Sequence, residues 1–475
     1  MTDKRSPWLT LVVLAIAQFI VTLDITIVNV ALPHIQTGLH FSASGLQWVI
    51  SAYTLLFGGF LLLGGRAADL LGRRRVLIAG LALFGAASLA AGLASSPGLL
   101  IAARAVQGLG GALLSPAALS ILTVTFPHGR SRNIAMGVWG GLAGLGGTLG
   151  VVAGGVLVDS LGWRWVFFVN VPIVLALIAI TPAFVAESRA RHGARTFDIA
   201  GALLSTFGLL ALVFGVVRAG SLGWGSAQVL ISMVGGAALL TAFAVAESRS
   251  AAPLVPPTLF RSRSLSTASL MLALNGAAFI SMFFLTALYL QEVRHDSALQ
   301  AGLQFLPMGF AAIAAAAVSS QLVTRIGTRP LQLAGAVLSV AGLVLLSRAG
   351  ASGSYVSQVL PGVVVFGVGI ICIGVPGQIT AVADVTEHEA GSASGVVTAV
   401  NQIGGAVGLA IVTTISDSRV SGALAHGAGH TDALVQGFHR GLLIAAVFAA
   451  VNIGVSLLSP EVRPTPEQLL DAAAA

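Results

Sequence analysis

The sequence predicts an all-α membrane protein with about fourteen transmembrane helices, and three observations lead to this prediction. Of its 475 residues, 56% are hydrophobic and only 9% are charged, whereas a soluble domain carries about 25% charged residues. Apolar runs of about 20 residues, the length that crosses a bilayer, recur along the whole chain. About 17 of the 24 Lys and Arg residues fall on one side of these runs, as the positive-inside rule requires of a cytoplasmic face.

The predicted spans follow the apolar runs, and polar or glycine-rich segments separate them. They lie near residues 8–33, 46–66, 75–95, 98–123, 133–158, 164–184, 198–218, 226–246, 266–290, 300–322, 330–347, 356–380, 391–415 and 438–458. The first run continues without an obvious cleavage site, so we interpret it as a retained helix and not as a secretory signal. An even number of spans and the excess of basic residues on one side place both termini in the cytoplasm.

Composition excludes several other functions. The net charge of +7 fits the cytoplasmic loops of a membrane protein, so we expect the chain to meet the lipid bilayer and to bind no nucleic acid. The single cysteine, Cys372, leaves no intrachain disulfide. The nine histidines lie mainly in predicted loops, without the spacing of metal ligands. We therefore expect no enzyme, no metal site and no cofactor.

The connection between the second and third spans carries a dense motif, Gly65-Arg66-Ala67-Ala68-Asp69-Leu70-Leu71-Gly72-Arg73-Arg74-Arg75. Consecutive arginines must lie at a membrane surface, and glycines permit a tight turn with close approach of the backbone. A basic loop that only fixes topology would explain the arginines but not the fixed frame of Gly65, Asp69 and Gly72. The pattern resembles the loop signature of the major facilitator superfamily, which lies between that family's second and third helices.

The resemblance implies a major facilitator fold, with two six-helix halves and two inserted helices. The implied domains are residues 8–184 and 266–458 for the halves, 198–246 for the inserted helices, and 460–475 for a cytoplasmic tail. A weak internal repeat supports the halves: Ser320–Arg329 aligns with the Gly65–Arg75 motif, and Gly327 falls on Gly72, although Thr324 replaces the aspartate. Secondary transporters are commonly built from such repeats, with a binding site between them.

The first span contains one acid, Asp24, in the stretch Leu23–Pro33. A carboxylate within a span is costly and is by default a functional candidate. Because Asp24 projects nearly opposite to a face that carries Gln18 and Asn29, we expect protein rather than lipid around this helix. The stretch closely resembles the first-helix motif of the fourteen-helix drug:proton antiporters, which implies a role of Asp24 in proton coupling. The alternative is an ion pair that only fixes packing.

The fourth span contains one basic residue, Arg104, in the stretch Leu100–Ala112. A guanidinium within a span needs a partner, and Asp24 is the only deep acid expected in the N-terminal half. The stretch matches the second motif of the same family, which implies a part in proton transfer, and a purely structural buried pair is again the alternative. Pairing favours ionised Asp24 and desolvation favours its neutral form, so a movement that breaks the pair would switch protonation.

The fifth span contains glycines at four-residue spacing, which form a flat face where another helix packs closely. The stretch resembles the antiporter motif of the family, G-x-x-x-G-P-x-x-G-G, with Val151 in place of the proline. Without the proline the helix kink is expected to be weaker. The glycines implied in packing are Gly146, Gly150, Gly154 and Gly155.

Further stretches match the same branch in the same order: Trp163–Pro172, Tyr289–Gln291, Ser297–Pro307 and Gly391–Gly408. The family arrangement implies a central substrate cavity between the first, fourth, ninth and twelfth spans. Its candidate contacts, each of which taken singly also fits plain packing, are Gln18, Asn29, Gln107, Asn275, Phe279, Phe283 and Gln378. An apolar, aromatic pocket with a few amides suits a bulky amphipathic molecule. Since Asp24 is its only acid, we do not expect dicationic substrates.

The loop after the twelfth span carries several acids and neither Lys nor Arg, and it includes Glu387 and Glu389. In this superfamily the second helix lies beside the helix equivalent to span thirteen. We therefore expect a cytoplasmic gate in which Glu387 or Glu389 pairs with the cluster Arg73–Arg75 across the halves. Asp69 would face the positive N-terminal end of span thirteen. The alternative is two unconnected, solvated loops.

These features favour proton-coupled export of hydrophobic or amphipathic compounds, such as drugs, antibiotics, biocides or secondary metabolites, across the bacterial cytoplasmic membrane. The alternative is an exporter of a metabolite or lipid-like molecule with narrow specificity. A membrane enzyme would need a clustered nucleophile or metal set, and a sensor would not need Asp24 and Arg104 in mid-span. The expected partners are the bilayer, protons and the small substrate, and we expect a monomer.

Overall fold

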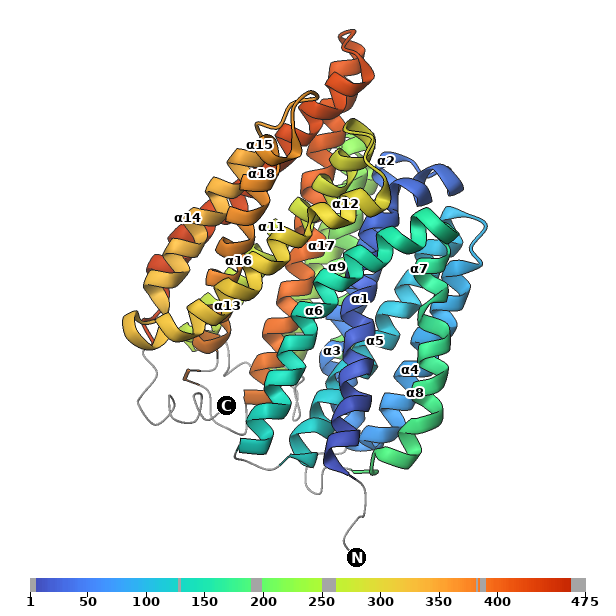
Figure 1. The fold of residues 1–475 in the computed structure, drawn as a ribbon, viewed down its shortest axis with the longest axis vertical. Helices are drawn as coiled ribbons and strands as arrows, with labels where there is room; N and C mark the ends of the chain where they lie inside the picture. Colours follow the sequence, from blue (N-terminus) through green and yellow to red (C-terminus); the bar gives the residue numbers. More distant parts are fainter. Residues whose placement is uncertain are drawn as a thin grey trace, which may run out of the picture.

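The computed structural model of the chain describes residues 6–126, 130–188, 199–249, 262–381, 383–384 and 390–462. In this part of the chain the protein consists of helices, and no strand is formed. Long helices run side by side in two bundles, one blue to green and one yellow to red (Figure 1). The prediction of an all-α membrane fold is confirmed.

The N-terminal bundle comprises the helices up to residue 184. They are α1 (Pro7–Leu39), α2 (Ala43–Leu46), α3 (Trp48–Leu71), α4 (Arg73–Gly92), α5 (Pro97–Thr125), α6 (Arg130–Leu161), α7 (Trp165–Phe168) and α8 (Asn170–Phe184). The start of α5 illustrates how the sequence sets these ends: the Ser96 hydroxyl accepts from the Leu99 N–H, and Pro97 takes a first-turn position that needs no donor. The bundle core includes Leu14, Leu81 and Phe84.

The C-terminal bundle comprises the helices from residue 263 onward. They are α11 (Arg263–Leu288), the π-helical turn η2 (Tyr289–Val293), α12 (Ala298–Gln304), α13 (Leu306–Ile326), α14 (Thr328–Leu346), α15 (Tyr355–Gln358), α16 (Leu360–Ala381), α17 (Ala390–Ala425) and α18 (His430–Leu458). A capping box starts α12, since Ser297 and Gln300 exchange side-chain and backbone hydrogen bonds that satisfy two otherwise unpaired N–H groups.

Two further helices, α9 (Ile199–Leu222) and α10 (Ala227–Arg249), pack as a pair beside the seam between the bundles. Val213 of α9 clusters with Leu55 of α3 and Ala406 of α17. At the seam itself, a Cβ placed on Gly58 of α3 would lie 3.2 Å from the carbonyl oxygen of Ala399 in α17. The expectation that the second span lies beside span thirteen is therefore confirmed.

The predicted spans correspond to the long helical segments one by one. Eleven helices in the described residues are long and apolar enough to cross a membrane, and three shorter apolar segments lie in α3, α6 and α9. The helices often exceed the predicted spans: the last one begins at His430 instead of residue 438. A helix can continue past the hydrocarbon because its backbone hydrogen bonds are internal, whereas hydropathy marks only the apolar part.

The internal repeat expected from the sequence is visible in the backbone. Gly72 alone separates α3 from α4, and Gly327 alone separates α13 from α14, with φ of 114° and 85°. Glycine adopts such positive φ values without steric cost. The next residue donates its N–H in the same way in each bundle: Arg73 to the Ser188 carbonyl at 3.0 Å, and Thr328 to the Val462 carbonyl at 3.1 Å.

We call the end of the molecule with these two turns the turn face, and the opposite end, with α2, α12 and α15, the far face (Figure 1). Polar contacts join the bundles toward the far face. Gln291 donates to the Val30 carbonyl at 3.1 Å, and Thr413 donates to Gln47. The bundles are therefore in contact at the far face in this conformation.

Candidate functional site

A buried ion pair between Asp24 and Arg104 forms the centre of the site. Arg104 of α5 donates from Nη1 to Oδ2 of Asp24 in α1 at 2.5 Å. The exposed fractions of their side chains are 0% for Asp24 and 1% for Arg104. The pairing that we expected from two lone charges in apolar spans is present, and its role in proton coupling is a proposal.

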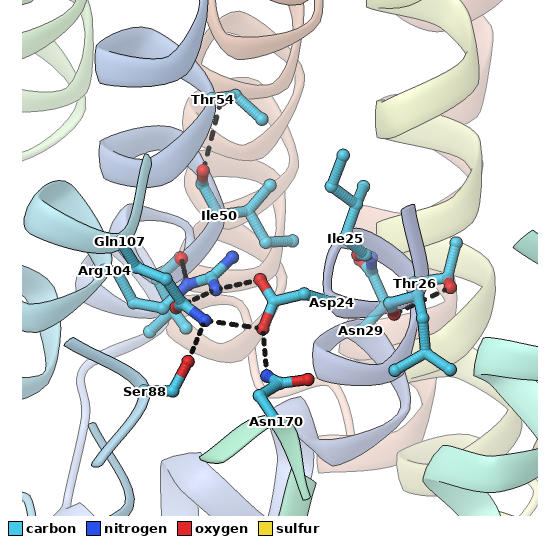
Figure 2. Close-up of polar contacts among 12 residues, drawn as sticks. Asp24, Ile25, Thr26, Asn29, Ile50, Thr54, Ser88, Arg104, Gln107 and Asn170 are labelled. Atoms are coloured by element: carbon cyan, nitrogen blue, oxygen red, sulfur yellow. Dashed lines mark hydrogen bonds and ion pairs between the residues drawn. The ribbon is translucent and has the colours of Figure 1, made fainter. Parts of the chain in front are cut away.

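Two amides hold the other oxygen of the carboxylate. Oδ1 of Asp24 accepts from Gln107 Nε2 at 2.8 Å and from Asn170 Nδ2 at 3.1 Å. The same Gln107 nitrogen donates to the Ser88 hydroxyl at 2.8 Å. Figure 2 shows Asp24 at the convergence of Arg104, Gln107 and Asn170. Helices α1, α4, α5 and α8 thus all contribute to the position of one carboxylate.

Arg104 has partners beyond the acid. Its Nε donates to the Val49 carbonyl at 2.9 Å, and its Nη1 donates to Gln107 Oε1 at 2.6 Å. The guanidinium lies 4.3 Å from the centre of the Tyr53 ring, a geometry of favourable cation–π attraction. The cation is therefore held in place by a helix end, an amide and an aromatic face.

This arrangement is sensitive to changes of charge. Breaking a buried pair by removing one partner costs about 3–5 kcal/mol, because the other charge stays buried without compensation. Protonation of Asp24 would have the same effect as such a removal. It would leave Arg104 without its counter-charge, and the link from this change of charge to transport is a proposal.

Sequence reasoning missed four members of the network: Val49, Tyr53, Ser88 and Asn170. Asn170 lies in the Trp163–Pro172 stretch, whose resemblance to the family gave it no role. Ser88 lies in an apolar span, and its hydroxyl is the only feature of the sequence there that indicates a polar contact. The Val49 carbonyl carries no sequence signal, because every residue has one.

The candidate cavity residues lie in different environments. Gln107 is completely buried in the ion-pair network, with its amide bonded on both sides. In this conformation the hydrogen-bonding groups of Gln107 are engaged within the network, and its contact with a substrate stays a prediction. Gln18 accepts from the Ser115 hydroxyl at 2.8 Å, and Asn29 donates to the Ile25 carbonyl at 2.7 Å.

The C-terminal candidates are spread over α11 and α16. Asn275 donates to the Ile370 carbonyl at 3.3 Å. Phe283 stacks on Phe305 with ring centres 4.3 Å apart, and Phe279 lies 6.0 Å from Phe283. Gln378 is exposed. Asn275, Phe279 and Phe283 lie at four-residue spacing on one face of α11, and the contact of the four residues with a substrate stays a prediction.

The glycines of α6 lie where two other helices approach. A Cβ on Gly154 would lie 3.0 Å from the Ile27 carbonyl oxygen of α1, and one on Gly155 would lie 2.5 Å from the Leu299 Cα of α12. Gly150 faces Thr26 of α1 in the same way. The helix thus contacts both bundles through its glycines. The surroundings of Gly146 lie outside the described residues.

The loop motif needs one correction. We expected the two glycines of the motif, Gly65 and Gly72, to permit a tight turn and close backbone approach, but a Cβ on Gly65 would meet only Pro116, at an ordinary 3.5 Å. The close approach is at Gly64, where a Cβ would lie 2.0 Å from the Ala112 carbonyl oxygen of α5. Helical phase explains the difference, because adjacent residues point about 100° apart, and Gly64 points at the α5 backbone whereas Gly65 meets only a side chain of α5.

The arginines of the turn have an acidic partner in their own bundle. Nε of Arg74 and Nε of Arg75 lie 3.8 Å and 3.7 Å from Oε2 of Glu187, which follows α8. Oε1 of Glu187 also accepts the Arg74 N–H at 3.2 Å. Sequence reasoning missed Glu187. The signal was a second repeat, since Val185–Ser188 after α8 and Ser459–Val462 after α18 both place a glutamate third.

Most of the other residues predicted for the gate lie outside the described part of the chain: Glu387, Glu389 and the side chain of Asp69. Most of the predicted tail 460–475 also lies outside it. Asp384, from the same acidic loop, accepts a hydrogen bond from Ser264 of α11. The latch between Glu387 or Glu389 and the arginines therefore stays a prediction.

Comparisons with known proteins agree with this architecture. A family model described as Major Facilitator Superfamily matches residues 14–409. The puromycin resistance protein pur8 of Streptomyces alboniger is 38% identical over 96% of this chain and 90% of its own length. The cephamycin export protein CmcT of Amycolatopsis lactamdurans is 38% identical over 98% of this chain and 95% of its own length.

One further relative and one solved structure are also similar to this chain. The multidrug resistance protein Stp of Mycobacterium tuberculosis is 35% identical over 89% of this chain and 78% of its own length. Among solved structures, a bacterial homologue of the human lysosomal transporter Spinster has a TM-score of 0.69 at 17% identity, with 96% of this chain and 97% of that chain covered. At that identity the structural likeness concerns the fold alone.

Proposed function

The chain belongs to the Major Facilitator Superfamily, and we propose that it exports antibiotics or related amphipathic compounds from the bacterial cytoplasm in exchange for protons. It is a multi-pass membrane transporter of the drug-efflux branch and not an enzyme. The substrate class rests on relatives named for resistance to puromycin and for export of cephamycin, which the chain matches over nearly its whole length.

The observation that carries the proton coupling is the Asp24–Arg104 pair. Asp24 is a fully buried acid whose charge is compensated by a single cation. In the proposed cycle, a proton from outside neutralises Asp24 and weakens the bond to Arg104, and its later release restores the pair. Each entering proton supplies about 2.3 kcal/mol per 100 mV of membrane potential.

The orientation follows from the positive charges. Arg73, Arg74 and Arg75 lie beside the Gly72 turn, so the turn face is the one that the positive-inside rule assigns to the cytoplasm. Thr10, near the start of α1, donates to the Phe184 carbonyl at the end of α8, which places the first helix start at this face as well. We therefore propose cytoplasmic termini, two six-helix halves with α9 and α10 inserted, and the Gly72 turn as part of a cytoplasmic gate.

A narrow substrate range is the second candidate. It is favoured by relatives whose names refer to one antibiotic each, at the same identity of 38%. A broad range is favoured by the multidrug resistance protein Stp at 35% identity. Drug susceptibility of an efflux-deficient host that expresses the chain would decide: resistance to one chemical class supports the narrow range, and resistance to several unrelated classes supports the broad one.

Proton coupling is tested with the purified full-length protein in proteoliposomes. An imposed pH gradient should drive puromycin or cephamycin transport, and Asp24→Asn should abolish this transport. Counterflow, in which labelled substrate exchanges for unlabelled substrate without a gradient, should persist in the variant, because the substrate path is intact. Gradient-driven transport at the parent rate in Asp24→Asn would remove Asp24 from the coupling role. Gel filtration of the variant controls for folding and tests the expected monomer.

A further inference from the structure

A cavity lined by two acids lies toward the far face, apart from the Asp24 network. It is enclosed by α11, η2, α17 and α18, and Gln36 and Leu46 bring the N-terminal bundle to its wall. Two carboxylates line it, Glu292 from η2 and Asp417 from α17. The π-helical turn that carries Glu292 is itself notable, because π-helical segments inside α-helices occur frequently at functional sites.

The two acids have few partners of their own. They are close enough to interact electrostatically with each other, and the His430 imidazole interacts with Glu292 from the start of α18. Within the described residues neither carboxylate forms a salt bridge, and the buried Oδ2 of Asp417 accepts no hydrogen bond. His430 does not line the cavity, and inside it the two like charges repel each other. A bound cation would remove that repulsion.

A buried hydroxyl points to a ligand independently of the acids. Ser416 lines the same cavity, and its exposed fraction is 6%. Within the described residues its hydroxyl forms no hydrogen bond, and because its oxygen is not fully enclosed, it is open to the cavity. The cavity volume is about 80 Å³, and a single water needs about 10–15 Å³ measured in the same way. The site thus has room for a small polar group beside Ser416.

The rest of the wall selects the kind of cation. It is apolar and aromatic, with Phe284, Leu288 and Phe438 among the lining residues. Hard metal ions take about six or more oxygen ligands and gain nothing from the apolar and aromatic side chains that make up most of this wall. An organic ammonium or guanidinium instead gains from carboxylates and aromatic faces together. Anions are disfavoured by both acids.

We propose that Glu292, Asp417 and Ser416 form a binding site for the ammonium or guanidinium head of an amphipathic compound. The site has room for the head group, and the apolar remainder of such a compound would lie along the aromatic wall. Because the wall includes Gln36 and Leu46, separation of the bundles at the far face would open the site. The inference concerns binding, so it does not depend on proton coupling.

A charge-selective labelling experiment tests the site in the full chain. Val420 lines the cavity, and Cys372 is the only cysteine of the sequence. Val420→Cys is therefore made in a Cys372→Ala background and modified with trimethylammonium-ethyl and with sulfonato-ethyl methanethiosulfonate. Each reaction rate is divided by the rate of the same reagent with free 2-mercaptoethanol. After this correction, the cationic reagent should modify the introduced thiol at least tenfold faster than the anionic reagent. Millimolar phenethylammonium should slow its reaction.

Neutral variants make the test specific. Glu292→Gln with Asp417→Asn should reduce the rate ratio to less than threefold and abolish protection by phenethylammonium. The matched control is Asp432→Asn, because Asp432 is an exposed acid of α18 outside the cavity. This variant should change neither the rate ratio nor the protection by phenethylammonium. Equal normalised rates in the parent, or equal protection by sodium chloride at the same concentration, would overturn the proposal. The comparison of the two reagents on the protein with both acids intact does not require the double variant to fold. The test therefore stays decisive even if Glu292→Gln with Asp417→Asn is unstable.

Discussion

The carboxylate of Asp159, at the end of α6, accepts a hydrogen bond at 3.0 Å from the backbone N–H of Leu299 in the first turn of α12. It also accepts from the Ser297 hydroxyl at 2.7 Å and the Ala298 N–H at 3.2 Å. One bundle thus caps a helix of the other, next to the point where Gly155 lets the two backbones touch. This contact must break whenever the far face opens.

Asp159→Ala should therefore shift the transporter toward a state that is open at the far face. Loss of a capping acceptor costs about 0.5–2 kcal/mol, which corresponds to roughly a 2- to 30-fold change in the ratio of closed to open forms. Spin labels at Leu161 and Leu303, which are exposed on α6 and α12, would report the change as a larger share of long distances.

A neighbouring acid supplies the control for this measurement. Asp296 pairs with Arg294 of its own bundle at 3.3 Å, so Asp296→Asn should leave the distance distribution as it is in the parent. An unchanged distribution in Asp159→Ala would mean that the cap does not hold the far face closed.

Gln107→Leu should slow gradient-driven export at least tenfold while substrate counterflow is preserved. The substitution keeps the side-chain volume but removes hydrogen bonds to both charges of the central pair. Hydrogen bonds to charged groups contribute about 1.5–3 kcal/mol each. In Gln332→Leu, which changes a buried amide of α14 in the C-terminal bundle, only a bond to the Thr380 hydroxyl is lost, so its export rate should stay within about threefold. Equal rates for the two variants would show that Gln107 does not position the pair.

The central pair could be predicted from the sequence for a simple reason. A lone acid and a lone base in apolar spans must find each other, because each is too costly alone. Asn170 and Ser88 are ordinary small polar residues, and they join the site only because α8 packs against α1 and α4 packs against α5. Such contacts depend on helix packing between distant segments, which hydropathy and spacing do not encode.

The same limit explains the error at the loop motif. The sequence marks both Gly64 and Gly65 as glycines, and the family pattern singles out Gly65. Which of them points at the α5 backbone depends on the rotation of α3 about its axis. Rotation is decided by the whole interface between helices, so the pattern predicted the turn correctly and the close contact incorrectly.

Gly64→Ala should consequently damage the protein far more than Gly65→Ala. The new methyl at residue 64 would meet a backbone carbonyl that cannot rotate away, and overpacking of this kind costs about 1–3 kcal/mol or more. The thermal unfolding midpoint in detergent, followed by gel filtration after heating, should fall by several degrees for Gly64→Ala and by less than one degree for Gly65→Ala. The reverse order would contradict the placement of α3 against α5.

The last prediction concerns the arginines at the Gly72 turn, for which two partners are now possible. Glu187 contacts Arg74 through the side chain and the backbone, whereas Glu387 and Glu389 are the partners expected across the halves. Exposed pairs contribute only about 0–1 kcal/mol each, so charge reversal gives a clearer signal than deletion. Arg74→Glu should lower drug resistance in cells, because it places a second acid beside Glu187.

Glu187→Arg in the Arg74→Glu background should restore resistance to within about fourfold of the parent, since the opposite charges meet again. Glu387→Arg and Glu389→Arg in the same background should restore little if the contact within the bundle is the important one. Arg75→Glu serves as the matched reversal, because its side chain is 67% exposed and should tolerate the change better. Rescue by Glu387→Arg or Glu389→Arg alone would instead establish the latch between the halves, formed when the turn face closes, and would reduce Glu187 to a local cap of the turn.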